Sequence, residues 1–252
     1  MKLDWLHSQK NEVFYLTPPA KEFEEVYLNV RNKEQRVLQD EIVMLLPFVN
    51  EDHPYASEWK KRRDTLQRFT KYLSNRKPNR VLEIGCGNGW FAHKISDHTN
   101  ICVGLDVGEE ELQQAARCFS NDKLAFVCCE DWNQIPEGSF DLVVFNASIQ
   151  YFDLTDQFWK DVYRLLDHGG EVHILDSMFY QKDMGVTAKS RSEEYFKELG
   201  VKEACSYYRH QTWEELPTNY KLKYKPTRLR SKFNRGKSPF PWIKIKAVYG
   251  EG

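Results

Sequence analysis

The chain has 252 residues with a formal net charge of −1, and 41% of its residues are hydrophobic. This length allows one large domain or one domain with an appended lid, and the composition excludes a disordered or fibrous chain. The small net charge excludes a global field that recruits nucleic acid or a membrane surface. The longest apolar stretch, Ile42–Val49, is interrupted by Pro47 and is too short to cross a bilayer. Six cysteines without a C-x-x-C pair or zinc-type spacing predict no metal site and favour a reduced, cytoplasmic protein.

The first third of the chain is predicted to be mainly helical. Residues 1–20 have no clear periodicity and no secretory apolar run, so we expect a loop there. Apolar residues recur at helical spacing from Glu22 to Leu46, and Ser57 is a plausible N-cap for a second helix. We therefore expect residues 1–76 to form a helical lid over a domain of residues 77–252 that carries a basic insertion near 217–240.

Strands alternate with amphipathic helices in the rest of the chain. Apolar runs predict five strands, at Val81–Ile84, Cys102–Asp106, Leu124–Cys128, Phe140–Phe145 and Val172–Leu175. This alternation predicts an α/β fold with a doubly wound, mostly parallel sheet covered on both faces. Gly169-Gly170 is expected to end a helix, and Ser190 and Glu193 have capping-box spacing for another. Residues Ala204–Tyr208 and Trp242–Tyr249 are expected to add an antiparallel pair at one edge.

Polar and glycine residues follow the predicted strands, where ligands bind in a doubly wound sheet. The first strand contains Glu83 and is followed by the loop Gly85–Gly89, in which every second residue is glycine. Asp106 ends the second strand, and a carboxylate there can accept hydrogen bonds from both hydroxyls of a ribose. Asp131-Trp132 follows the third strand and Asn146 the fourth. Four strand ends in register indicate a cofactor site more strongly than a glycine loop alone.

Two cofactor classes compete for this loop. An NAD-dependent oxidoreductase has the fingerprint G-x-G-x-x-G, whose helix N-terminus binds a pyrophosphate. Here the glycines run G-x-G-x-G, Trp90 follows them, and Glu83 lies two residues before the first glycine. A carboxylate is unfavourable beside a pyrophosphate and favourable beside a cationic amino-acid head group. The residues therefore favour S-adenosylmethionine (SAM) over NAD, and the oxidoreductase is kept as an alternative.

Three segments carry a family resemblance. Val81–Gly89 resembles motif I of the class I SAM-dependent methyltransferases, in the form E-x-G-x-G-x-G. Asp131–Val143 is similar to the family's D-x-x-x-L-P…G-S-F-D-L-V run, and Leu165–Gly170 resembles its L-K-P-G-G turn with Asp-His in place of Lys-Pro. The resemblance covers residues 78–180 and is closest to the small-molecule enzymes of the ubiquinone-methylating type. It implies a Rossmann-like fold and methyl transfer that releases S-adenosylhomocysteine (SAH).

The resemblance also implies roles for individual residues. Glu83 and Gly85–Gly89 would hold the methionine end of SAM, and Asp106 the ribose hydroxyls. Asp131-Trp132 would bind the adenine, and Asn146 would direct a backbone carbonyl toward the methionine amine. The predicted cofactor-binding residues are Glu83, Gly85, Cys86, Gly87, Gly89, Asp106, Val107, Asp131, Trp132 and Asn146. A structural alternative stays open for each acid, as a local backbone cap, a turn residue or a solvated loop residue.

The acceptor side contains no certain catalytic residue. Methyl transfer needs positioning, and it needs a base only if the acceptor must lose a proton. Candidates at the expected mouth of the site are Tyr151, Asp176, His53 and His210, together with Tyr180 and Tyr55. Residues 146–149 read Asn-Ala-Ser-Ile and lack the N/D-P-P-Y/F/W tetrad of enzymes that methylate nucleic acid bases. A small-molecule acceptor is therefore favoured.

A basic segment keeps other interpretations open. Lys221–Lys246 contains ten Lys or Arg residues and no acid, interleaved with aromatic residues. Such a segment can follow the phosphates of an RNA, bind an anionic small substrate, or form a solvated loop. A SAM-dependent RNA-modifying enzyme is thus an alternative function, and a non-catalytic SAM-binding module is another. The sequence predicts no oligomeric state.

Overall fold

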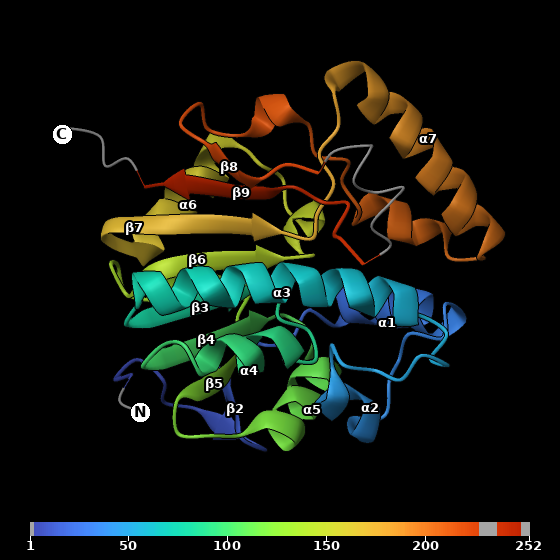
Figure 1. Cartoon of the computed structure of the whole chain (residues 1–252). Helices are drawn as coiled ribbons and strands as arrows, with labels where there is room; N and C mark the ends of the chain where they lie inside the picture. Colours follow the sequence, from blue (N-terminus) through green and yellow to red (C-terminus); the bar gives the residue numbers. More distant parts are fainter. Residues whose placement is uncertain (1–2, 227–235, 248–252) are drawn as a thin grey trace.

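One nine-stranded sheet runs through the middle of the molecule (Figure 1). The computed structural model describes residues 3–226 and 236–247, in which the strand order is β1-β2-β5-β4-β3-β6-β7-β9-β8. The strands are β1 (Gln9–Lys10), β2 (Val13–Tyr15), β3 (Arg80–Ile84), β4 (Ile101–Asp106), β5 (Leu124–Cys128), β6 (Phe140–Asn146), β7 (Leu166–Leu175), β8 (Lys221–Tyr224) and β9 (Trp242–Lys246). The α-helices are α1 (Lys21–Lys33), α2 (Asp40–Leu45), α3 (Ala56–Arg76), α4 (Trp90–Ser96), α5 (Glu109–Phe119), α6 (Asp156–Leu165) and α7 (Lys182–Glu198). Within the described ranges, no helix combines the length and apolar character needed to cross a bilayer.

The central strands are parallel, and their register follows from their apolar composition. Leu82 on β3 pairs with Val103 on β4 and with Val143 on β6, and all three side chains are fully buried. A parallel strand covered on both faces is apolar along its length, as the sequence of these strands is. β9 adds to β7 in the antiparallel direction. The predicted mostly parallel, Rossmann-like sheet with an antiparallel strand near one edge is confirmed.

The order of the strands places a cleft beside β3. From β3 the chain moves outward to β4 and β5, and it then returns to β6 on the other side of β3. The strand order therefore reverses between β3 and its neighbours, and ligands of open α/β sheets bind at the carboxyl ends of the strands at such a point. The glycine loop that follows β3 lies at this position.

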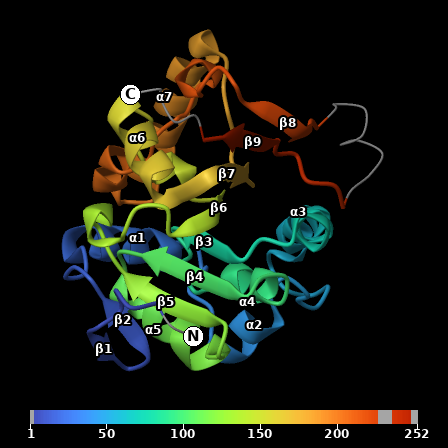
Figure 2. The ribbon, with the colours of Figure 1, turned by 90° about the vertical axis from the view of Figure 1, so that its left-hand side faces the viewer.

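Helices cover both faces of the sheet. On one face, α3, α4 and α5 contribute Phe69, Phe91 and Leu112 to a common core. On the other face, α6 contributes Phe158 and Val162 to a second core. Figure 2 shows α3 and α4 on one side of the sheet and α6 on the other. The sheet is thus buried between two helical layers, as its continuous apolar strands require.

Two further helices lie at the carboxyl ends of the parallel strands. In Figure 1, α1 and α7 stand at the end of the sheet to which the arrowheads of β6 and β7 point. Phe196 of α7 and the following Val201 form a small core against Val26 and Val30 of α1. Within residues 1–76, α1 is thus the element over the strand ends, whereas α3 packs on a face of the sheet.

The expected loop over residues 1–20 contains a short hairpin that was not predicted, and the expected single helix from Glu22 to Leu46 is wrong. Residues 9–15 form a short hairpin whose second strand, β2, pairs in parallel with β5, with Val13 opposite Phe126. The helix is interrupted after α1, where Gln35 adopts a left-handed backbone with φ of 55°, and α2 begins five residues later. Strands of two or three residues are too short for periodicity to reveal.

Three expected helix ends also differ from the structure. Ser57 lies inside α3, one residue after its start. Gly169-Gly170 lies within β7, where the pairing with β6 is irregular, so the left-handed Gly169 forms part of a strand distortion and not a helix cap. Ser190 and Glu193 lie inside α7, and the Ser190 hydroxyl donates to the carbonyl of Val186 at 3.3 Å. Serine often makes such a bond within a helix, so spacing alone did not identify a cap.

The antiparallel edge has a different partner from the one expected. β9 pairs with β8, with Leu222 opposite Ile243. Residues 202–206 form a 3-10 helix instead of a strand. The last residues of the expected second strand, including Tyr249, lie outside the described ranges.

Candidate functional site

The glycine loop makes a tight turn that only glycine accommodates. Gly85, Gly87 and Gly89 have φ values of 75°, 50° and 74°. The Gly85 N–H donates to the carbonyl of Leu105 at 2.8 Å, which fixes the loop to the end of β4. A Cβ on Gly85 would lie 2.4 Å from the Cβ of Ser148. The loop therefore brings backbone to the carboxyl end of the sheet with no side chain in the way.

Asp106 joins this loop to the end of β4. Its carboxylate accepts hydrogen bonds from the backbone N–H groups of Gly87 at 2.7 Å, Val107 at 2.7 Å and Gly108 at 3.1 Å. Burial raises the pKa of Asp106, and these three hydrogen bonds act in the opposite direction. A carboxylate has about four acceptor positions, so one is left for a ligand.

Glu83 and Asn146 provide buried acceptors without donors. Their side chains are 1% and 6% exposed, at the ends of β3 and β6. Glu83 Oε2 and Asn146 Oδ1 have no hydrogen-bond partner among the described residues. Burial raises the pKa of Glu83 well above its ordinary value. Unpaired buried acceptors cost free energy, and they fit a ligand that brings donors, such as the ammonium of an amino acid.

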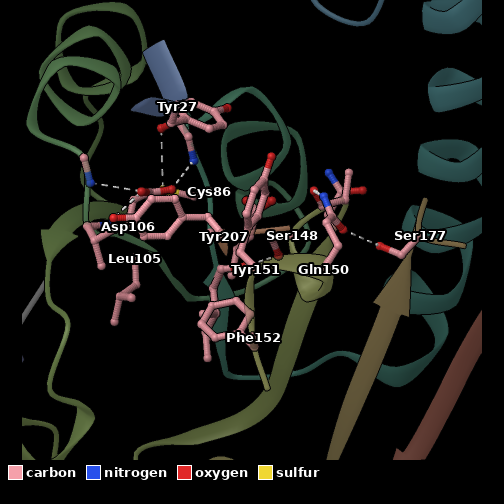
Figure 3. A pocket seen from close by; sticks show the side chains of 18 of the residues that line it. Tyr27, Cys86, Leu105, Asp106, Ser148, Gln150, Tyr151, Phe152, Ser177 and Tyr207 are labelled. Atoms are coloured by element: carbon pink, nitrogen blue, oxygen red, sulfur yellow. Dashed lines mark hydrogen bonds between the residues drawn. The ribbon is translucent and has the colours of Figure 1, made fainter. Parts of the chain in front are cut away.

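These residues line one large cavity of about 830 Å³ at the carboxyl ends of β3, β4, β6 and β7. Figure 3 shows Tyr27, Tyr151 and Tyr207 gathered around it close to Asp106. Nine of the ten predicted cofactor-binding residues line the cavity: Glu83, Gly85, Cys86, Gly87, Asp106, Val107, Asp131, Trp132 and Asn146. The tenth, Gly89, lies beneath the loop, where a Cβ would contact Phe126 and Ala115. The described residues contain no group of His, Cys, Asp or Glu that could hold a metal ion.

Asp131 and Trp132 begin a 3-10 helix, Trp132–Gln134, at the rim of the cavity. Asp131 is the N-cap, and its carboxylate accepts a hydrogen bond from the backbone N–H of Asn133 at 3.1 Å. That bond lowers the pKa of Asp131. The Trp132 ring packs against Phe152 and Phe158 at centroid distances of 5.6 and 5.9 Å. Both residues thus have a local structural role, and their contact with adenine stays a prediction.

Among the acceptor-side candidates, Asp176 and Tyr151 line the cavity, as does Tyr180. Asp176 Oδ1 accepts hydrogen bonds from the hydroxyls of Thr65 at 2.6 Å and Ser238 at 3.2 Å. Its other oxygen, Oδ2, is buried without a partner among the described residues. Asp176 also has a left-handed backbone, with φ of 46°, a conformation that is uncommon outside glycine and recurs at functional sites.

The two histidine candidates and Tyr55 do not line the cavity among the described residues. His53 accepts a hydrogen bond from the backbone N–H of Tyr55 at 3.1 Å, in the turn before α3. The Tyr55 hydroxyl donates to the backbone carbonyl of Glu34. His210 lies 2.8 Å from the Ser192 hydroxyl, beside α7. Each of these three side chains has a structural role where it lies.

A cluster of charged residues on the cavity wall was not predicted. Arg31 on α1, Arg36 after it, and Glu58 and Arg62 on α3 all line the cavity. The Glu58 carboxylate accepts two hydrogen bonds from Arg36, at 3.1 and 2.8 Å, and two from Arg62, at 3.1 and 2.9 Å. No motif marks these residues, because they come together only when α1 packs beside the first turns of α3.

Glu58 predicts a pH dependence of stability. Burial acts to raise its pKa, but the hydrogen bond from Arg36 and the charge of Arg62 outweigh this effect and lower the pKa to about 2. Because the folded pKa is depressed, the stabilisation is complete above the unfolded value and is lost as pH falls toward 2. We expect Glu58→Gln to reduce the free energy of unfolding by about 1 kcal/mol at pH 7. Urea titrations should show this difference shrinking between pH 5 and pH 3.

The matched control for Glu58 is Glu51→Gln. Glu51 pairs only with Lys60, at 3.0 Å, and its side chain is 89% exposed. We expect this variant to unfold like the wild-type protein at every pH. A Glu58→Gln deficit that does not change with pH would contradict the assignment of a depressed pKa.

Known proteins are similar to the part of the chain that forms this cavity. The model of a methyltransferase domain family matches residues 82–174. The chain is 31% identical over 121 residues to malonyl-[acyl-carrier protein] O-methyltransferase 1 of Ilyobacter polytropus, covering 47% of this chain and 44% of that protein. It is 29% identical over 110 residues to the malonyl-[acyl-carrier protein] O-methyltransferase of Erwinia billingiae, covering 42% of each. The chain thus spans less than half the length of the curated relatives it matches.

Solved structures share the fold over a longer stretch. Magnesium protoporphyrin IX methyltransferase from Synechocystis superposes with a TM-score of 0.54 and 14% identity, covering 91% of this chain and 97% of that chain. A putative methyltransferase from Bacillus halodurans superposes with a TM-score of 0.54 and 16% identity, covering 73% and 99%. These likenesses establish the fold, and the matched domain lies on the glycine loop and the strand ends described above. Residues 82–174 thus match a methyltransferase domain, and the chain has the Rossmann-like fold of these solved methyltransferases.

Proposed function

We propose that this protein transfers a methyl group from SAM to a small-molecule acceptor that carries an anionic group. The observation that supports this best is the pair of unpartnered buried oxygens on Glu83 and Asn146, two residues that line the same cavity as the arginine cluster. One part of the cavity is thus suited to a cationic amino-acid cofactor and another to an anionic acceptor. An NAD-dependent oxidoreductase has no comparable support.

The chain's own residues would bind the cofactor and exclude water. SAM supplies an electrophilic methyl group on a sulfonium. Glu83 and Asn146 would accept hydrogen bonds from its ammonium, and Asp106 would accept those of its ribose hydroxyls. Tyr27 and Tyr151, whose ring centroids are 6.0 Å apart, would close the wall. A dry wall of this kind strengthens electrostatic interactions inside the cavity.

Asp176 is the best placed of the candidate proton acceptors. Thr65 and Ser238 donate to one of its oxygens, the other is buried without a partner among the described residues, and the residue lines the cavity. Burial raises the pKa of Asp176. A raised pKa makes a carboxylate a better proton acceptor, so Asp176 would suit an acceptor hydroxyl or amine that must lose a proton. Tyr151 is retained as a residue that positions the acceptor.

Three observations support a small acceptor over an RNA. A cavity of about 830 Å³ has the size of a site for a small molecule. In the described part of the basic segment, Lys237 lies 2.8 Å from Asp64 and Lys244 lies 2.6 Å from Glu171, so these charges are already compensated. Two relatives are named as O-methyltransferases of a malonyl group, which is an anion.

The six cysteines, all free, agree with the proposed reduced, cytoplasmic location.

Glu83→Gln tests the cofactor part of this proposal. Glutamine keeps the shape of the side chain but removes the charge that would face the SAM ammonium. A hydrogen bond to a charged group contributes about 1.5–3 kcal/mol, so we expect SAM binding to weaken by about 10- to 100-fold. Isothermal titration calorimetry with SAM measures this change.

Glu137→Gln is the control for Glu83→Gln, because Glu137 is exposed and does not line the cavity. This variant should bind SAM like the wild-type protein. Wild-type affinity in Glu83→Gln would remove the role of Glu83. Binding of NAD in preference to SAM by the wild-type protein would contradict the proposed function as a whole.

A further inference from the structure

Arg31 lines the cavity and forms no ion pair among the described residues, and burial acts to lower its pKa while the nearby Tyr27 and Glu111 groups outweigh this effect and raise it. Its Nε is buried and has no hydrogen-bond partner, and no ion pair to its guanidinium occurs among the described residues. The guanidinium carbon lies 5.8 Å from the centroid of the Tyr27 ring. A buried guanidinium normally has a carboxylate or carbonyl partner, because its desolvation is costly. The Nε–H of Arg31 is therefore a buried donor that no described protein group accepts.

The neighbouring arginines increase the positive charge at this place. Burial and the charge of Arg31 act to lower the pKa of Arg36, but the hydrogen bond and the charge of Glu58 outweigh these effects and raise it. Arg36 and Arg62 share the carboxylate of Glu58, and Arg36 also lies 3.4 Å from a carboxylate oxygen of Glu34. Both of these acids are thus engaged by Arg36 or Arg62, and neither forms an ion pair with Arg31.

The remaining acid in this region does not compensate Arg31 fully. Burial raises the pKa of Glu111 to about 6, against the opposing charge of Arg31 and a hydrogen bond from Tyr27. The carboxylate of Glu111 is directed toward the glycine loop, where it lies 2.8 Å from the position of a Cβ on Gly87. Glu111 therefore lies beside the glycine loop, and its charge acts on Arg31 without an ion pair between the two among the described residues.

We infer that Arg31 binds an oxyanion of the methyl acceptor, a carboxylate or a phosphate, with Arg36 and Arg62 adding attraction. This inference rests on the proposed function, because it identifies the bound anion as part of the acceptor. A guanidinium presents parallel N–H groups that match a carboxylate or a phosphate with two hydrogen bonds. Tyr27, Tyr151 and Tyr208 surround this part of the cavity and favour the contact by excluding water.

Calorimetry on the SAH-loaded protein tests the inference with two probes, inorganic phosphate and malonate, at constant ionic strength. We expect at least one probe to bind the wild-type protein and to bind Arg31→Gln about 10- to 100-fold more weakly, as for a lost charge-assisted hydrogen bond. The control is Arg191→Gln, since Arg191 is exposed on α7 and does not line the cavity. The probe that binds more tightly identifies the oxyanion as phosphate or carboxylate.

A second variant should change the affinity for the probe in the opposite direction. Glu58→Gln removes the carboxylate that competes for Arg36 and Arg62, so it should bind the same probe more tightly than the wild-type protein does. Equal binding by wild-type and Arg31→Gln proteins, no binding of either probe, or no gain in Glu58→Gln would overturn the inference. SAH affinity is measured first in every variant. Loss of SAH binding by the wild-type protein would instead contradict the proposed function.

Discussion

Asp106→Ala should weaken SAM binding by at least about 100-fold. The acceptor position that Asp106 has left would take one charge-assisted hydrogen bond from a ribose hydroxyl, which contributes about 1.5–3 kcal/mol. The same carboxylate holds the backbone N–H groups of Gly87, Val107 and Gly108, so its removal also loosens the loop that carries the methionine end. Calorimetry with SAM measures the loss, and circular dichroism checks that the fold persists.

Two further variants limit the interpretation of Asp106→Ala. Asp106→Asn keeps one acceptor oxygen and should lose less affinity than alanine does. Asp97→Ala changes an exposed aspartate at the end of α4 and should bind SAM like the wild-type protein. If Asp106→Ala binds SAM within threefold of wild type, the ribose hydroxyls do not lie on this carboxylate.

Gly89→Ala is expected to destabilise the fold by about 2–4 kcal/mol, which lowers the melting temperature by roughly 5–15 °C. A Cβ at this position would lie 2.6 Å from the Phe126 ring and 2.7 Å from the Cβ of Ala115, both in the core under the loop. The backbone φ of 74° adds a cost of about 1 kcal/mol for any residue with a Cβ. Thermal and urea unfolding measure the change.

Gly169→Ala separates the two causes. Gly169 also has a left-handed backbone, with φ of 84°, but a Cβ there would meet no atom within 4 Å. This variant should lose only about 1 kcal/mol, from the backbone alone. Equal losses in the two glycine variants would mean that close packing under the loop contributes nothing.

The parallel centre of the sheet could be predicted because each of its strands is buried on both faces. Leu82 and its partners Val103 and Val143 belong to continuous apolar runs, which are visible without knowledge of the neighbours. The edge strands could not be found in this way. Val13 is fully buried, but β2 is three residues long and its pairing with Phe126 depends on tertiary contact alone.

The two sides of the cavity also differ in whether the sequence predicts them. The predicted cofactor residues lie at the ends of consecutive strands, so the topology brings Glu83, Asp106 and Asn146 together. The charged wall of the acceptor side comes from other elements. Arg31 lies on α1 and Glu58 in the first turn of α3, and only the packing of these two helices brings them to one cavity. The spacing of residues in the sequence does not predict such a contact.

A crystal structure with SAH bound is the most direct test of the cofactor site. We expect the homocysteine beside Glu83 and Asn146, the ribose on Asp106, and the sulfur facing the part of the cavity that contains Arg31 and Asp176. SAH bound elsewhere, or bound with its sulfur facing away from that part of the cavity, would contradict the proposed site.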